Sequence, residues 1–151
     1  MIVATISWSN AADDFAKQSY SRRHTWSFDG GLTIAASSSP DIVPVPMSDA
    51  SAVDPEEAFV ASLSSCHMLW FLSIAAKAGF VVEEYIDEAA GEMRENDAGK
   101  SFIAVVTLRP VVKWGGDREP ESAELRRLHD QAHEECFIAN SVKTQIRIEI
   151  E

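Results

Sequence analysis

The sequence contains little cysteine: only Cys66 and Cys136 occur among its 151 residues. A domain of this size, with 46% hydrophobic residues, buries a sufficient core without a disulfide framework. We expect a cytoplasmic protein, and in that reducing compartment two cysteines are poor candidates for a permanent disulfide. Three interpretations stay open at this point: a reactive pair, a metal-binding pair, or two inert core residues.

Positive charge is also scarce. The 13 Lys and Arg residues stand against 24 Asp and Glu residues, so the formal net charge is -11. Nucleic acid and anionic membrane surfaces attract basic proteins, and neither is expected as a partner. The N-terminus lacks the basic and apolar regions of a signal peptide, and no apolar run approaches the ~18 residues of a membrane span. We therefore expect a soluble protein in which residues 1–151 form one domain.

Several catalytic and metal motifs are missing. The sequence has no Gly-rich phosphate loop, no nucleophile elbow of a serine hydrolase, and no CxxC pair of a zinc site. Cys66-His67 and His133-x-x-Cys136 offer two sulfurs and two ring nitrogens as a metal set. Adjacent residues on a helix point about 100° apart and chelate badly, so this is the weaker interpretation. We expect no metal and no cofactor.

Strand patterns dominate both ends of the chain. Residues 1–40 alternate apolar and smaller or polar side chains around Asp29-Gly30-Gly31, a turn signal typical of a hairpin. Residues 37–54 are rich in turn formers and predict a loop. Further strands are predicted at 80–94, 101–114 and 142–150, with a turn at 96–99.

Two helices are predicted between these strands. The segment Asp54-Pro55-Glu56-Glu57 starts the first, because Asp caps, Pro suits the first position and carboxylates favour the N-terminal end. Gly79 is its natural stop. A short amphipathic helix follows from about Glu121 to Cys136. A sheet of about six strands with separate helices is an α+β fold. From Cys66 onward the first helix is apolar on nearly all sides, so we expect a second subunit to cover it.

The alternation in the segment 20–28 sorts its residues onto two faces. Tyr20, Arg22 and His24 fall on the inward face with Trp26 and Phe28, whereas Arg23 falls on the outward face. A buried Arg is too costly to leave unpaired, so Arg22 should meet a carboxylate or an anion. A structural ion pair is the alternative for Arg22, and a hydrogen-bonded core residue is the alternative for His24.

A thiol becomes nucleophilic near a helix N-terminus, a cation or a metal, and Ser64-Ser65 just before Cys66 suggests a fresh helix start. In a straight helix Glu56 and Cys66 would lie ~15 Å apart, so we predict a kink near residues 62–65 that brings Glu56 back. The alternatives are a small buried hydrophobe for Cys66 and a first-turn charge for Glu56. Cys136 stands at a helix end, and the sequence does not decide whether it meets Cys66.

Two segments of this chain resemble the family of osmotically induced and organic hydroperoxide resistance proteins, OsmC/Ohr. DPEEAFVASLSSCHMLWFL is similar to the family's Pro-Glu segment with its peroxide-reacting Cys ten residues later. HEECFIANSVKTQIRIEI is similar to the family's ending of second Cys, Asn-Ser and final strand. The resemblance covers nearly the whole chain. It implies an OsmC/Ohr-like fold, with antiparallel sheets wrapped around central helices in an interlocked homodimer whose active sites lie at the subunit interface.

The resemblance also implies a cysteine-based peroxidase that reduces organic hydroperoxides, with a dithiol or a lipoylated protein as reductant. Cys66 would attack the peroxide and Cys136 would resolve the product as a disulfide. The family's Arg and Glu map to Arg22 and Glu56, although the context also leaves Arg23 open. An apolar peroxide-binding wall is expected from Phe59, Leu63, Trp70 and Phe71, for which a core role is the alternative. A second functional class is a non-catalytic thiol sensor or binding module of the same fold.

Overall fold

The computed structural model describes residues 1–11 and 14–151. These residues form an α+β structure, as predicted. They divide into two compact units, Met1–Ala58 and Phe59–Glu151, and each unit is described by itself. The assignment of residues 1–151 to one domain stays a prediction.

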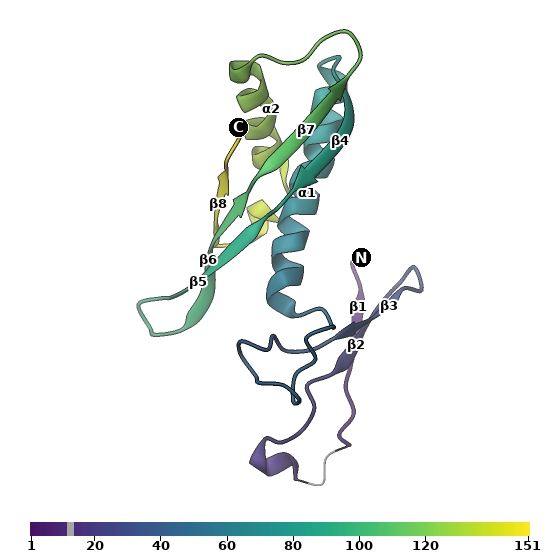
Figure 1. The fold of residues 1–151 in the computed structure, drawn as a ribbon, viewed down its shortest axis with the longest axis vertical. Coiled ribbons are helices and arrows are strands. Elements are labelled where there is room, and N and C mark those ends of the chain that lie inside the picture. Colours follow the sequence, from purple (N-terminus) through teal and green to yellow (C-terminus); the bar gives the residue numbers. More distant parts are fainter. Residues whose placement is uncertain (12–13) are drawn as a thin grey trace. The chain divides into compact units, whose positions relative to one another are not determined.

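The first unit is built on a three-stranded antiparallel sheet in the order β1-β2-β3 (Figure 1). β2 (His24–Phe28) and β3 (Thr33–Ala36) form the predicted hairpin, and Gly31 in its turn has a φ of 90° that favours glycine. The edge strand β1 (Ala4–Ser7) is followed by a short 3-10 helix, η1 (Phe15–Lys17). The predicted loop over 37–54 is confirmed.

Helix α1 (Pro55–Lys77) begins and ends where the sequence predicts. Its start is a reciprocal capping box: the Glu57 backbone N–H donates to Asp54 Oδ1 at 2.8 Å, and the Asp54 N–H donates to Glu57 Oε1 at 2.8 Å. At its end, Gly79 has a φ of 85° and the Phe80 N–H donates to the carbonyl of Ala75 at 3.0 Å. Such a left-handed glycine closes a helix by satisfying its last carbonyl groups.

Two predictions about this helix are wrong. α1 continues through residues 62–65, so no new helix N-terminus stands before Cys66, because serine is tolerated within an otherwise strong helical sequence. The helix also contains an 18-residue window of mean hydropathy 1.6, long and apolar enough by composition to cross a membrane. Serines interrupt the apolar residues of this window, but its mean hydropathy is still that of a possible membrane span. The core helix of a soluble protein passes the same test.

The second unit contains a long hairpin whose two halves belong to different sheets. Each long strand predicted here is divided in two: β4 (Val81–Asp87) and β5 (Ala90–Glu95), then β6 (Ser101–Leu108) and β7 (Pro110–Gly115). β5 pairs with β6 across the predicted turn at 96–99, and β4 pairs with β7 in a separate sheet. The breaks at 88–89 and at Arg109 allow one hairpin to serve two sheets.

The chain ends with α2 (Ser122–Glu135), a short 3-10 helix η2 (Ala139–Ser141) and β8 (Gln145–Ile148). β8 pairs with β6 in parallel, so the prediction that the sheets are antiparallel fails for this pair. β7 and α2 intervene between β6 and β8, and a crossover of this length permits parallel pairing. The alternation of half-buried and exposed residues over 142–150 agrees with the predicted strand.

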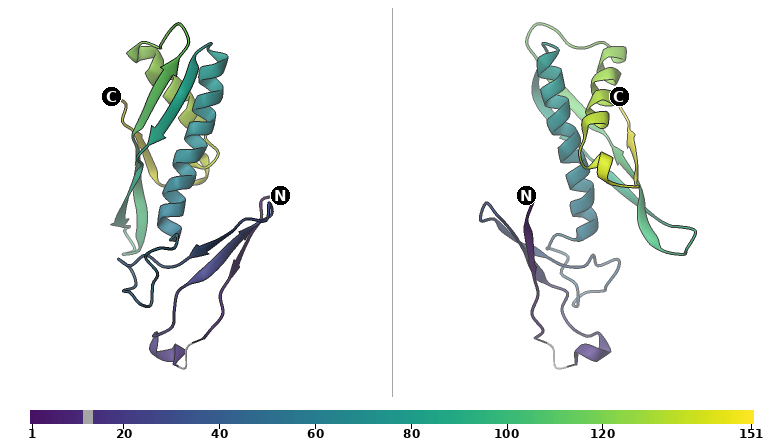
Figure 2. Two further views of the ribbon diagram at one scale, coloured as in Figure 1. Left: turned by 45° about the vertical axis from the view of Figure 1, so that its right-hand side comes forward. Right: turned by 180° about the vertical axis from the view of Figure 1, so that it is seen from behind.

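Two buried clusters hold the second unit together. α1 and α2 lie side by side on one face of the β4–β7 sheet (Figure 2), and between them Phe71 and Leu128 are buried with Ala75, Phe80 and Ala132. A second cluster joins Leu63 of α1 to Val106 and Leu108 of β6. Burial of large aliphatic and aromatic side chains is the main force that fixes these elements.

Candidate functional site

The two cysteines meet in the second unit. Both are free thiols, and the side chain of Cys66 on α1 lies near enough to that of Cys136, at the C-terminal end of α2, to raise its pKa. Cys66 is half-buried, whereas Cys136 is only 1% exposed. The chain therefore places its two sulfur atoms together, as the reactive-pair interpretation requires.

The turn after α2 surrounds the sulfur of Cys136 with backbone donors. Cys136 is the residue that follows the helix, and the Ala139 N–H donates to its sulfur at 3.4 Å. The Asn140 side chain donates to the carbonyls of Glu134 and Cys136 at 2.8 and 3.0 Å. These contacts fix the end of α2 at the turn that the Asn-Ser pair of the sequence predicts.

The two thiols are chemically unequal. Burial, and after it the hydrogen bond with Cys66, raises the pKa of Cys136 above its ordinary value. Cys136 therefore keeps its proton at neutral pH. Since the thiolate is the nucleophilic form, this arrangement suits Cys66 to attack first and Cys136 to react afterwards.

Arg22 lies in the first unit, where its side chain is half-buried while Arg23 is exposed. The Arg22 Nη1 donates to the carbonyls of Gln18 and Tyr20 at 2.7 and 2.5 Å, and the guanidinium lies 3.7 Å from the centroid of the Tyr20 ring. The alternation of faces is confirmed for Arg22. Its described partners are carbonyl oxygens rather than the expected carboxylate, because the bend before β2 turns backbone oxygens towards it.

Arg23 and His24 both have partners within the first unit. Arg23 forms an ion pair with Asp49 of the loop. His24 bonds the carbonyl of Arg22 through Nδ1 at 2.7 Å and accepts the indole N–H of Trp26 through Nε2 at 3.0 Å. Both ring nitrogens therefore have hydrogen-bond partners, one of which is the backbone of Arg22. The core interpretation is the one that fits His24.

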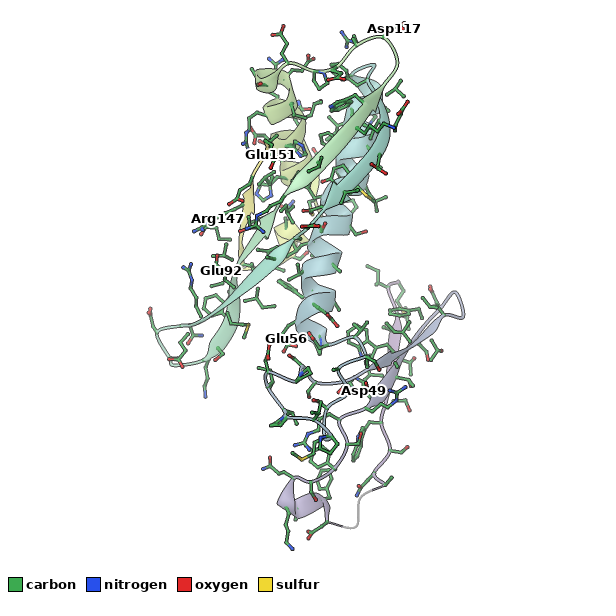
Figure 3. The ribbon with its side chains drawn as sticks, viewed as in Figure 1. Asp49, Glu56, Glu92, Asp117, Arg147 and Glu151 are labelled. Atoms are coloured by element: carbon green, nitrogen blue, oxygen red, sulfur yellow. The ribbon has the colours of Figure 1, made fainter. Side chains whose placement is uncertain are left out.

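Glu56 stands in the first turn of α1 (Figure 3). Its Oε2 is buried and has no hydrogen-bond partner within the described part of the chain. A buried carboxylate oxygen without a partner is costly, and a guanidinium satisfies it best. Because α1 is unbroken, Glu56 remains ten residues from Cys66 and the predicted kink does not bring them together.

A pair of histidines that the sequence interpretation missed lies behind the cysteines. His67 Nε2 and His129 Nδ1 are 3.0 Å apart, the rings are parallel, and both side chains are buried at 1% and 0% exposure. Burial lowers the pKa of His67 to about 4 and that of His129 to about 3, so both rings are neutral at pH 7. His129 shares the apolar face of α2 with Leu128 and Ala132, which was the available signal.

The residues predicted as a metal set or as an apolar wall do not form these sites together in the described residues. No group of three or more His, Cys, Asp or Glu side chains suited to a metal ion occurs among residues 1–11 and 14–151. Leu63 and Phe71 are fully buried in the two core clusters, so the core role applies to them. Phe59 and Trp70 are half-buried, and Trp70 contacts Phe137, next to Cys136, edge to face at 5.5 Å.

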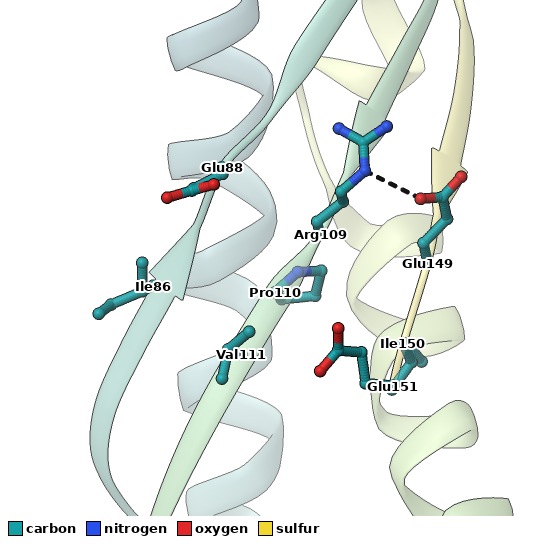
Figure 4. A pocket seen from close by; sticks show the side chains of 8 residues that line it. All are labelled: Ile86, Glu88, Arg109, Pro110, Val111, Glu149, Ile150 and Glu151. Atoms are coloured by element: carbon teal, nitrogen blue, oxygen red, sulfur yellow. Dashed lines mark hydrogen bonds and ion pairs between the residues drawn. The ribbon is translucent and has the colours of Figure 1, made fainter.

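A cavity of about 450 Å³ lies near the C-terminus, lined by residues of β4, β7 and the chain end (Figure 4). Arg109 in its wall is paired with Glu149 at 2.9 Å. Neither cysteine lines it. The thiol pair, rather than this cavity, is the candidate functional site.

The chain is thus an α+β protein with two neighbouring free cysteines. The model of the OsmC-like protein family matches residues 48–151, so this chain belongs to that family. An OsmC-like protein of unknown function from Vibrio cholerae has 51% sequence identity and a TM-score of 0.97, covering 100% of this chain and 99% of its own.

More distant solved structures share the fold. An organic hydroperoxide resistance protein of Legionella pneumophila has 14% identity and a TM-score of 0.70, with 99% of this chain and 94% of that chain covered. A second, from Bacillus subtilis, has 16% identity and a TM-score of 0.68, with 100% and 98% covered. No curated protein matches the sequence.

Proposed function

We propose that this protein is a thiol-dependent peroxidase that reduces organic hydroperoxides, such as lipid or alkyl hydroperoxides, to alcohols. The observation that carries the proposal is the pair of free thiols, Cys66 and Cys136, which lie close enough for Cys66 to raise the pKa of Cys136. Membership of the OsmC-like family supports it, as do the organic hydroperoxide resistance proteins of the same fold. A reducing cytoplasm suits a pair that cycles between thiols and disulfide.

The reaction proceeds in three balanced steps. The Cys66 thiolate attacks the terminal peroxide oxygen, the O–O bond breaks, and the alkoxide takes up a proton and leaves as the alcohol. Cys66 is then a sulfenic acid, which condenses with the Cys136 thiol to form a disulfide and water. A dithiol, free or on a lipoylated protein, returns two electrons and two protons and regenerates both thiols.

We assign Arg22 as the cation that stabilises the Cys66 thiolate and Glu56 as the carboxylate that holds the guanidinium. The unpartnered, buried Oε2 of Glu56 and the inward face of Arg22 support these roles. Ten residues of one straight helix separate Glu56 from Cys66 by ~15 Å. We therefore propose a homodimer in which a second copy of the chain supplies this pair and covers the apolar surface of α1.

Turnover separates the peroxidase from a non-catalytic thiol sensor. Purified protein is mixed with cumene hydroperoxide and dihydrolipoamide, and peroxide loss is followed to completion. We expect many equivalents of peroxide to be consumed per subunit. A sensor forms the same disulfide but consumes about one equivalent, and that result would refute the peroxidase.

The two neighbouring arginines provide a matched test of the site. Arg22→Ala is expected to slow sulfenic acid formation about ten- to a hundredfold, because a charge-assisted hydrogen bond to the thiolate is lost. Arg23→Ala removes the same charge but only its ion pair with Asp49, so its rate should stay near that of the wild type. Stopped-flow measurement with the reductant omitted isolates this step. Equal losses in both variants would contradict the assignment of Arg22.

A further inference from the structure

The histidine pair joins the same two helices as the thiol pair. His67 is the residue after Cys66 on α1, and His129 stands on α2, seven residues before Cys136. The 3.0 Å contact between their ring nitrogens therefore connects α1 to α2 close to the cysteines. Seven residues of α-helix span ~10 Å, so the position of His129 determines where the end of α2 lies.

Each ring has the other as its hydrogen-bond partner. The outer nitrogens, His67 Nδ1 and His129 Nε2, are buried and have no partner within the described residues. The bond between the two rings is thus the one hydrogen bond that either ring makes there. An unmade buried hydrogen bond is costly, so sliding α2 along α1 would break this contact without replacement.

Neighbouring side chains also contact the histidine pair. Phe71 stacks on the His129 ring with centroids 4.2 Å apart, which fixes its plane. The charged or titratable groups that act on the pair are Asp87 of β4 and His133 and Arg126 of α2. Asp87 is itself occupied, because it accepts hydrogen bonds from Ser64 and from the Arg109 backbone.

We propose that the hydrogen bond between His67 and His129 is the positioning contact that sets α2 in register on α1 and so presents Cys136 to Cys66. This deepens the proposed function, since it assigns the two histidines to the resolving step. They touch neither peroxide nor sulfur in this role, and they act through the placement of Cys136. The quantity that they control is the effective concentration of one thiol at the other.

Disulfide equilibrium measures that quantity without any peroxide. In mixtures of oxidised and reduced dithiothreitol, the Cys66 and Cys136 thiols pass two electrons and two protons to the oxidised reagent and form the protein disulfide. His129→Phe keeps the ring shape but cannot bond His67, and we expect the equilibrium constant to fall at least about tenfold. His129→Asn places a hydrogen-bonding atom near the lost Nδ1 and should restore most of the constant.

Leu128→Ala is the matched control, because it loosens the packing of α2 at the neighbouring residue while leaving the histidine bond intact. Its equilibrium constant should stay within about twofold of the wild type. If His129→Phe does not fold, the double variant His67→Phe with His129→Phe replaces both partners by similar shapes and carries the same expectation. An unchanged constant in the phenylalanine variants, or an equal fall in Leu128→Ala, would overturn the positioning role. Because peroxide is absent, either result leaves the peroxidase proposal untouched.

Discussion

Replacing Cys66 by Ser is expected to lower peroxide consumption about a thousandfold or more, because a hydroxyl group cannot replace a thiolate nucleophile. Cys136→Ser should behave differently. With the reductant omitted, its Cys66 still attacks, so one equivalent of peroxide is consumed and the protein stays at the sulfenic acid because no second thiol is present. The two variants thus separate the attacking thiol from the resolving thiol.

Intact-mass spectrometry after one equivalent of a lipid hydroperoxide checks this assignment directly. We expect the wild type to lose two hydrogens, Cys136→Ser to gain one oxygen, and Cys66→Ser to remain unchanged. Both variants are conservative in size, and circular dichroism verifies that they fold. A gain of oxygen on Cys136 in Cys66→Ser would reverse the roles, and the raised pKa of the buried Cys136 argues against that outcome.

Local signals made much of the fold predictable. The capping residues Asp54 and Glu57 and the stop at Gly79 determine α1 because they act on the backbone of their own helix. The division of the long strands and the parallel pairing of β8 with β6 were missed. These depend on which strands meet in space, and the alternation of a single strand carries no information about its partner.

In the candidate site, too, features with a local signal were predicted and contacts between distant residues were not. Alternation placed Arg22 inward and Arg23 outward, and the structure agrees. The contact between Cys66 and Cys136 was left open, because no local rule predicts the path of the chain between two residues 70 positions apart. The pairing of His67 with His129 was invisible for the same reason: each helix, taken alone, presents a histidine on an apolar face without a partner.

The buried histidines also predict a strong loss of stability in acid. A histidine ordinarily has a pKa of 6.5, whereas burial lowers that of His67 to about 4 and that of His129 to about 3. Below pH 6.5 these histidines therefore bind protons in the unfolded chain but not in the folded chain. Their contribution to the free energy of unfolding is fully present above pH 6.5 and decreases as the pH falls. We expect a loss of about 3 kcal/mol from each histidine, and so about 6 kcal/mol from the pair, between pH 7 and pH 4. Urea unfolding across this range measures it.

Carboxyl groups ordinarily titrate near pH 4, so their contribution to the acid sensitivity must be subtracted from that of the histidines. The double variant His67→Phe with His129→Phe keeps Asp87, His133 and Arg126 and removes only the two rings. Because both partners become apolar and keep their shape, its stability at pH 7 should be close to that of the wild type. Its loss between pH 7 and pH 4 should be smaller by about 6 kcal/mol. An equally steep loss in the double variant would assign the acid sensitivity to the carboxylates, and the neutral histidine pair would then contribute nothing to it.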